Sequence, residues 1–236
     1  MHPLWLLTIV LAAAAYHALV VAEGTYLGSR VVAMLYDRVA PRYDHIKNVR
    51  YVHESFFLGI PLAERLQGLP APAILDVATG TGRLPLAVVP LIAEGSVVVG
   101  VDRSGGMLRT GAQACMSLGS SAVFMQADAE SLPMADASFD AVTCIEALEF
   151  FVHPDAALEE MRRVLRPGGV LLASNRVGWE AVLLPRRVAR RGTLEKRLSR
   201  LGFSDVESRR WQVHYDLVWA RLAESGDPGN GRLLRT

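Results

Sequence analysis

Cysteine is scarce in this chain of 236 residues, which contains two, Cys115 and Cys144. They fall in a predicted helix and a predicted strand, so we expect buried, reduced thiols rather than a disulfide. No group of cysteine and histidine residues has the spacing of a zinc site, and we therefore predict no metal. An excess of one charge is also missing, because 25 Lys and Arg oppose 24 Asp and Glu. The overall charge thus indicates no particular partner.

Formal charge is absent from one long stretch, Pro3 to Ala22. About twenty residues is the length that an α-helix needs to cross roughly 30 Å of hydrocarbon. A cleaved signal peptide is disfavoured, because the start is not basic and the apolar run is long. A buried N-terminal helix remains an alternative, since Thr8, Tyr16 and His17 interrupt the run. We predict a hydrophobic helix over residues 1–24 that anchors the chain in a membrane.

The residues that flank this stretch indicate an orientation. No Lys or Arg precedes it, whereas Arg30, Arg38 and Arg42 follow it. Positive flanks tend to stay on the cytoplasmic side, so a single pass would place the following domain in the cytoplasm.

Residues 71–222 alternate between apolar strand patterns and helical patterns. The predicted segments are 73–78, 83–93, 97–102, 105–118, 122–127, 139–145, 154–166 and 170–175. Such alternation predicts a parallel sheet covered by helices on both faces. Two further strands, near 206–212 and 214–221, would close the sheet, and we expect the tail 223–236 to be disordered.

A turn with two glycines follows the first predicted strand, in the order Asp76, Ala78, Gly80 and Gly82. Glycine lets backbone N–H groups and a helix N-terminus approach a ligand closely. A nicotinamide or flavin enzyme would need a third glycine, in the pattern Gly-x-Gly-x-x-Gly. That glycine is absent, so the turn disfavours an oxidoreductase.

The next two strands also end on aspartates, Asp102 and Asp128. In an open parallel sheet the carboxyl ends of the strands border one crevice, where an acidic residue hydrogen-bonds a ribose. The sequence therefore predicts a nucleoside-binding site lined by three carboxylates, which come from Asp76, Asp102 and Asp128.

These motifs together resemble the class I S-adenosylmethionine-dependent methyltransferases, over roughly residues 36–221. The glycine turn matches the cofactor loop of that family, with Ala78 in place of a frequent first glycine. Val101-Asp102-Arg103-Ser104-x-x-Met107-Leu108 is similar to the ribose-binding motif. Asp128-Ala129-Glu130-x-Leu132-Pro133 resembles the loop on the adenine side, and Arg166-Pro167-Gly168-Gly169 the turn before the fifth strand.

The resemblance implies an α/β fold: a Rossmann-like, doubly wound, mostly parallel seven-stranded sheet with an antiparallel C-terminal hairpin. It also implies S-adenosylmethionine as cofactor. Asp102 would bind the ribose, and Met107 would pack near the adenine. The full set of predicted cofactor residues is Asp76, Ala78, Gly80, Gly82, Asp102, Arg103, Met107, Asp128, Ala129 and Ile145.

Residues 25–70 have a mostly helical pattern, and we predict that they cap the domain. The run Tyr36-Asp37-x-x-Ala40-x-x-Tyr43-Asp44 is similar to the N-terminal segment of the quinone-biosynthesis C-methyltransferases and related lipid methyltransferases. By that resemblance Tyr43 would face the transferred methyl group. An ordinary amphipathic helix with packed tyrosines is the alternative.

The segment after the fourth strand offers three proton acceptors, Glu146, Glu149 and His153. We take Tyr43, Glu146 and His153 as the candidate catalytic residues. The segment does not match the Arg-Asn pattern of the quinone family, which weakens that particular assignment.

A basic amphipathic stretch over residues 176–200 carries eight Lys or Arg against two Glu. We expect this stretch to contact a membrane surface rather than RNA. The alternative to both is a helix face that is simply exposed to solvent, which is the usual fate of a run of charges.

The leading hypothesis is a membrane-anchored methyltransferase that acts on a lipid-like or quinone-like acceptor. A methyltransferase for a soluble molecule and a non-catalytic S-adenosylmethionine-binding protein are the alternatives. In-line methyl transfer depends mainly on alignment and exclusion of water. The sequence therefore specifies the cofactor side of the site better than the acceptor side.

Overall fold

The computed structural model describes residues 3–18, 22, 25–119, 122–178 and 191–224. Its seven strands form a single mixed sheet in the order β3-β2-β1-β4-β5-β7-β6. The strands are β1 (Ala73–Val77), β2 (Val97–Asp102), β3 (Val123–Gln126), β4 (Phe139–Cys144), β5 (Leu165–Arg176), β6 (Phe203–Arg210) and β7 (Tyr215–Leu222). β1 to β5 are parallel, whereas β7 runs antiparallel to both β5 and β6. The predicted sheet and its closing hairpin are confirmed.

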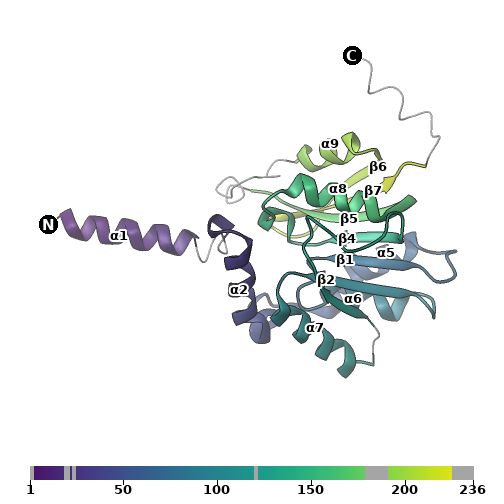
Figure 1. Ribbon diagram of the computed structural model, residues 1–236, viewed down its shortest axis with the longest axis horizontal. Coiled ribbons are helices and arrows are strands. Elements are labelled where there is room, and N and C mark those ends of the chain that lie inside the picture. The colour runs from purple at the N-terminus through teal and green to yellow at the C-terminus, as the bar shows by residue number, and fades with distance from the viewer. Residues whose placement is uncertain (1–2, 19–21, 23–24, 120–121, 179–190, 225–236) are drawn as a thin grey trace, which may run out of the picture.

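Helices cover both faces of the sheet (Figure 1). They are α5 (Ile60–Arg65), α6 (Arg83–Val88), α7 (Gly105–Ser117), α8 (Pro154–Val164) and α9 (Thr193–Arg200). Alternate residues of β1 point to opposite faces: Leu75 packs in one core with Leu158 and Leu198, and Ile74 in another with Leu84. Both faces are apolar because a parallel sheet is buried on each side.

The helix predicted over 154–166 ends earlier, at Val164. The backbone N–H groups of Ala137 and Ser138 bind the carbonyls of Arg163 and Val164, so those carbonyls are no longer available to the helix. β5 begins at Leu165, and Gly168, at φ +77°, lies within an irregular part of that strand.

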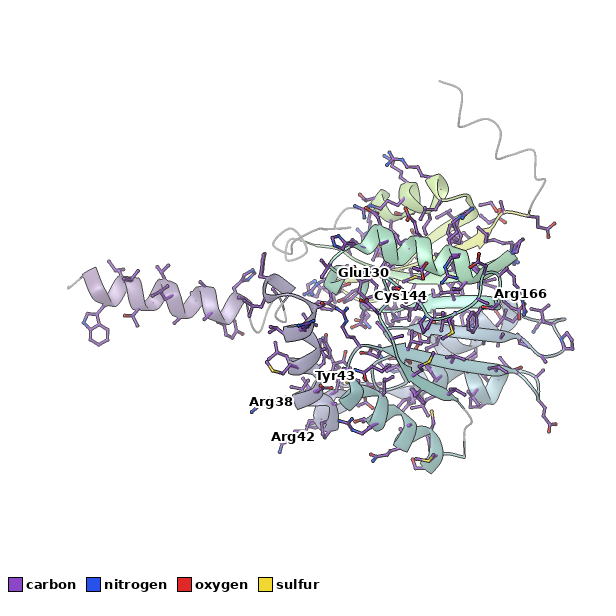
Figure 2. The ribbon with its side chains drawn as sticks, in the orientation of Figure 1. Arg38, Arg42, Tyr43, Glu130, Cys144 and Arg166 are labelled. Atoms are coloured by element: carbon purple, nitrogen blue, oxygen red, sulfur yellow. The ribbon has the colours of Figure 1, made fainter. Side chains whose placement is uncertain are left out.

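Residues 25–70 form a series of short helices, and Leu58 and Leu62 near its end pack on one face of the sheet. The helices are η2 (Thr25–Leu27), α2 (Ser29–Val39), η3 (Ala40–Arg42), α3 (Tyr43–Ile46), α4 (Tyr51–Glu54), the π-helical η4 (Ser55–Gly59) and then α5. Figure 2 shows Arg38 and Arg42 on the outer side of this segment, with Tyr43 nearer the body of the protein.

Of the helix predicted over residues 1–24, the structure describes α1 (Pro3–Tyr16), and residues 1–2, 19–21 and 23–24 lie outside the described residues. α1 extends away from the sheet on the side where α2 lies (Figure 1), and Trp5 and Val10 are 70% and 61% exposed. Over the described ranges, no helix has both the length and the apolar character needed to cross a bilayer. A transmembrane helix is therefore not found among these residues.

The basic stretch over 176–200 is described only at its two ends. Arg176 lies 4.0 Å from Glu149, Arg191 binds Asp216 through two hydrogen bonds, and Arg197 pairs with Asp155. These three cations therefore contact carboxylates of the fold instead of forming one basic face. Residues 179–190 and the tail from 225 onward lie outside the described residues.

Candidate functional site

A cavity lies where β1, β2 and β4 end, which is where a doubly wound sheet binds its ligand. Its walls include nine of the predicted cofactor residues: Asp76, Ala78, Gly80, Asp102, Arg103, Met107, Asp128, Ala129 and Ile145. Tyr43 and Glu146, two of the candidate catalytic residues, also line it. The fold thus gathers residues that are far apart in the sequence.

The glycine turn forms one wall. Ala78 and Gly80 have left-handed backbones, at φ +56° and +55°. A side chain at Gly80 would meet no atom within 4 Å, so the space beside this residue is open to a ligand. Ala78 adopts its conformation at a cost of about 1 kcal/mol that glycine would not incur.

Gly82, the tenth predicted cofactor residue, is not among the residues that line the cavity. It lies at the N-terminal end of α6 with φ +80°, and a Cβ there would approach the ring of Phe124 to 3.0 Å. The glycine is needed for this close packing between the turn and β3.

Asp102 connects the glycine turn to the start of α7. Its Oδ2 accepts a hydrogen bond from the Gly80 N–H at 2.9 Å, and its Oδ1 accepts one from the Ser104 N–H at 2.8 Å. Burial raises the pKa of Asp102, although these N–H donors act in the opposite direction. Each oxygen has a second lone pair, which the hydroxyls of a ribose can use.

Asp76 is the most deeply placed acid of the cavity. Its side chain is buried, and its Oδ1 accepts a hydrogen bond from the Thr143 hydroxyl at 2.6 Å. Burial raises the pKa of Asp76 to about 6, despite the opposing effect of Thr143. A cation in the cavity would favour the ionised carboxylate.

Two neighbouring residues bind the carboxylate of Asp128. Arg103 forms an ion pair with Asp128 Oδ2, and the Glu130 N–H donates to its Oδ1 at 3.2 Å. Both side chains of the ion pair are partly exposed at the cavity wall. This pair therefore shapes the side of the cavity that the motifs assign to the adenine.

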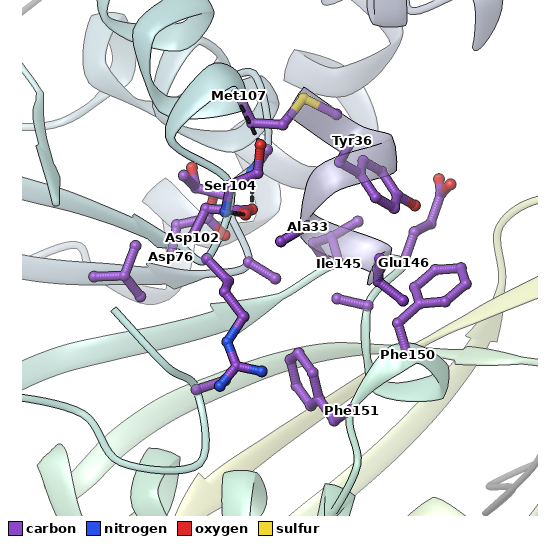
Figure 3. A pocket seen from close by; sticks show the side chains of 18 of the residues that line it. Ala33, Tyr36, Asp76, Asp102, Ser104, Met107, Ile145, Glu146, Phe150 and Phe151 are labelled. Carbon is purple, nitrogen blue, oxygen red and sulfur yellow. Dashed lines mark hydrogen bonds between the residues drawn. The ribbon is translucent and has the colours of Figure 1, made fainter. Parts of the chain in front are cut away.

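Two tyrosines from the cap face the same cavity. The rings of Tyr36 and Tyr43 lie 5.8 Å apart, and Tyr36 meets Phe150 edge-on at 6.2 Å. Figure 3 shows Asp76, Asp102 and Ser104 on one side of the cavity, with Tyr36, Phe150 and Phe151 on the other. The cavity thus has an acidic side and an aromatic side.

The aspartates that follow these tyrosines bind the cofactor turns. Asp37 Oδ1 accepts hydrogen bonds from the Ser104 hydroxyl at 2.6 Å and the Gly106 N–H at 2.7 Å. Asp44 accepts one from the Thr81 hydroxyl at 2.5 Å and one from Tyr51 at 2.8 Å. These contacts fasten the cap to the sheet domain.

Glu146 lies directly beyond β4 with an unusual left-handed backbone, at φ +51°. Its Oε1 accepts hydrogen bonds from Arg83 at 3.1 Å and Gln212 at 3.0 Å, and its N–H donates to the Ser174 hydroxyl. Arg83 also binds both oxygens of the buried Glu54 at 3.0 Å. Strained residues of this kind are common at functional sites.

The other two proton acceptors lie elsewhere. His153 precedes α8, is exposed, and uses its backbone N–H to bind Glu130 at 2.8 Å, so it is not part of the cavity wall. Glu149 is buried away from the wall and accepts a hydrogen bond from the Tyr215 hydroxyl. Burial raises the pKa of Glu149 to about 7.

A methyltransferase family model matches residues 75–173, which contain the glycine turn, Asp102, Asp128 and Glu146. This match agrees with the motif-based prediction that the cavity binds S-adenosylmethionine. The cavity fits this molecule chemically, because carboxylates suit a cationic sulfonium and a ribose diol. Asp76 would hold the amino-acid end, Asp102 the ribose, and Met107 and Ala129 the adenine.

Curated relatives of the chain carry the names of methyltransferases. A demethylmenaquinone methyltransferase of Renibacterium salmoninarum is 36% identical over 143 residues, which are 61% of this chain and 57% of that protein. A ubiquinone/menaquinone biosynthesis C-methyltransferase of Geotalea daltonii is 33% identical over 147 residues, or 61% of this chain and 62% of that protein. The chain thus spans less than two thirds of the length of these relatives.

Solved structures share the fold at low identity. The cyclase SpnF is similar with a TM-score of 0.68 and 21% identity, covering 84% of this chain and 97% of that one. A SAM-dependent methyltransferase from Aquifex aeolicus is similar with a TM-score of 0.59 and 20% identity, covering 70% of this chain and 88% of that one. Such likenesses establish the fold alone, since one fold supports different chemistries.

Sequence reasoning missed several residues that build the site: Tyr36, Asp37, Asp44, Glu54, Thr81, Arg83, Ser104 and Phe150. The signal for three of them was the Tyr-Asp pair repeated after seven residues, at Tyr36-Asp37 and Tyr43-Asp44. Glu54 and Phe150 carried no such signal, because only the fold brings them to the cavity.

Proposed function

We propose that this chain transfers the methyl group of S-adenosylmethionine to an aromatic, quinone-like or other lipid-like acceptor taken from a membrane. One observation carries the proposal: a single cavity joins a carboxylate side to an aromatic side. The names of the quinone-methylating relatives support the same class of acceptor.

The bound cofactor supplies an electrophilic methyl group on a positively charged sulfur. Asp102 and Asp76 orient that molecule from the acidic side. Tyr36, Tyr43 and Phe150 hold a flat acceptor on the other side and exclude water. Correct alignment of the two reactants accounts for most of the acceleration.

Glu146 is the proposed acceptor of any proton that the substrate loses. It is one of three candidate proton acceptors, and it lines the cavity whereas His153 and Glu149 do not. Arg83 and Gln212 fix its carboxylate at the cavity wall. We assign no chemical role to His153.

We also propose that α1 holds the chain at a membrane, with the methyltransferase domain in the cytoplasm. The apolar side chains of α1 are exposed, and Ser29, Val32 and Ala33 of the nearby α2 line the cavity. An acceptor dissolved in the bilayer would thus enter beside the membrane-bound helix. Arg30, Arg38 and Arg42 add positive charge on this segment.

Calorimetric titration with S-adenosylmethionine tests the cofactor side. We expect micromolar binding, weakened at least tenfold, or about 1.4 kcal/mol, by Asp102→Asn. Asp155→Asn is the matched control, because Asp155 is exposed on α8. A folded wild-type protein that did not bind would contradict the proposal.

Methylation assays with labelled cofactor test the acceptor side and separate catalysis from mere binding. We expect turnover of a quinol embedded in vesicles, and a loss of vesicle binding and of that turnover in Leu7→Glu/Leu11→Glu. Met116→Glu, another exposed apolar position, is the control. If the double variant kept full activity on embedded quinol, the membrane role would be wrong. If a water-soluble acceptor alone were methylated, the alternative function would replace it.

A further inference from the structure

A second cavity, of about 450 Å³, adjoins the first. That volume is within the range of roughly 300–1,000 Å³ typical of small-molecule sites. Arg83 and Glu146 line both cavities, so these two side chains form the partition between them. The remaining walls come from residues 47–57 of the cap, the end of β5, and the turn between β6 and β7.

The walls of this second cavity carry more positive than negative charge. Four cations face two carboxylates, a formal excess of +2: Lys47, Arg50, Arg83 and Arg176 against Glu54 and Glu146. His53 and His214 also line it and add charge when protonated. Arg83 forms ion pairs with both glutamates, so the other positive charges of the wall come from Lys47, Arg50 and Arg176.

Aromatic rings accompany these cations. Phe57, Trp211 and Tyr215 line the cavity. The guanidinium of Arg83 lies 5.8 Å from the Trp211 ring, and that of Arg176 lies 5.9 Å from the Tyr215 ring. Walls of this kind suit a flat ring that bears a negative charge, because the ring stacks while the charge meets cations.

Lys47 links the two cavities through Tyr43. The Lys47 ammonium lies 5.9 Å from the ring of Tyr43, which lines the first cavity. Glu146 and Arg83 line both cavities, so a molecule in the second cavity would contact the same two side chains that border the place proposed for methyl transfer. Neither the sequence motifs nor the relatives' names assign a role to this space.

We infer that the second cavity binds the anionic part of the methyl acceptor, an aromatic compound bearing a carboxylate or an ionised hydroxyl. The inference rests on the proposed function, since it specifies the acceptor of that same reaction. Lys47 and Arg50 are the specificity-determining residues, and Trp211 and Tyr215 form the stacking surface.

The test uses calorimetric titration of the full chain with 1-naphthoate and with its uncharged analogue of the same shape, 1-naphthamide. We expect the carboxylate to bind at least tenfold more tightly than the amide. Lys47→Gln/Arg50→Gln should reduce that preference at least fivefold. Lys196→Gln/Arg200→Gln, which removes the same charge from α9, should leave it unchanged.

S-adenosylmethionine binding, measured on each variant, separates the two proposals. Retained cofactor binding with equal affinity for naphthoate and naphthamide would overturn the anion subsite and leave the proposed function intact. Inorganic phosphate that displaced naphthoate at equal concentration would also overturn it, because the cavity would then bind any anion. A wild-type protein that preferred naphthoate but did not bind cofactor would contradict the proposed function instead.

Discussion

Asp37 and Asp44 bind two different cofactor turns, although only seven residues separate them. Asp37 accepts the hydroxyl hydrogen of Ser104 at the start of α7, and Asp44 accepts that of Thr81 in the glycine turn. The tyrosine that precedes each aspartate faces the cavity. One short segment thus sets both the position of the cap and the aromatic side of the site.

The contact between Asp37 and Ser104 should appear as a coupling energy. Asp37→Ala and Ser104→Ala should be non-additive by about 1 kcal/mol in the free energy of unfolding, because the double variant loses one shared hydrogen bond. Denaturant titration of the wild type, both single variants and the double variant measures this value. Asp37→Ala with Ser117→Ala, at the far end of α7, should be additive. A coupling near zero for the first pair would contradict the contact.

Asp76→Asn should stabilise the cofactor-free protein at neutral pH while weakening cofactor binding. Burial raises the pKa of Asp76 from 3.8 to about 6, so the folded state holds the proton more tightly than the unfolded state. The stabilisation by that proton is complete below pH 3.8 and is lost as the pH rises through 6. At pH 7 the variant should therefore be more stable by up to about 3 kcal/mol.

Urea denaturation between pH 4 and pH 8 measures this difference, which should shrink towards zero at the acidic end. Asp155→Asn, on the exposed surface of α8, should show no comparable trend. An Asp76→Asn variant less stable than wild type at pH 7 would contradict the assigned burial penalty. Its affinity for S-adenosylmethionine should fall at least tenfold at pH 7.

Arg83→Met should destabilise the protein by about 3–5 kcal/mol, because it leaves two buried carboxylates, Glu54 and Glu146, without their partner. Thermal denaturation measures the loss. The triple variant with Glu54→Gln and Glu146→Gln should recover a large part of the stability, since no unpaired charge then remains. If the triple variant were as unstable as Arg83→Met, packing rather than charge would explain the effect.

The order of strands and helices followed from the sequence because parallel strands are apolar on both faces and end at glycine or acidic turns. Local patterns also predicted most of the cofactor side: Asp76, Gly80 and Asp102 lie beside one cavity as expected. Gly82 shows the limit of such reasoning. Its glycine is required, but for packing against Phe124 of β3, a contact between distant segments.

By itself the sequence determined the doubly wound sheet and the acids at its strand ends, because both depend on periodicity and on short-range turn chemistry. Tertiary structure alone decided which proton acceptor reaches the cavity: Glu146 does, and His153, seven residues later, does not. It also decided the partition between the two cavities, where Arg83 meets Glu54 and Glu146. These contacts join the cap, α6 and the end of β4. A local sequence pattern does not predict them, because these segments are far apart in the sequence and meet only when the chain folds.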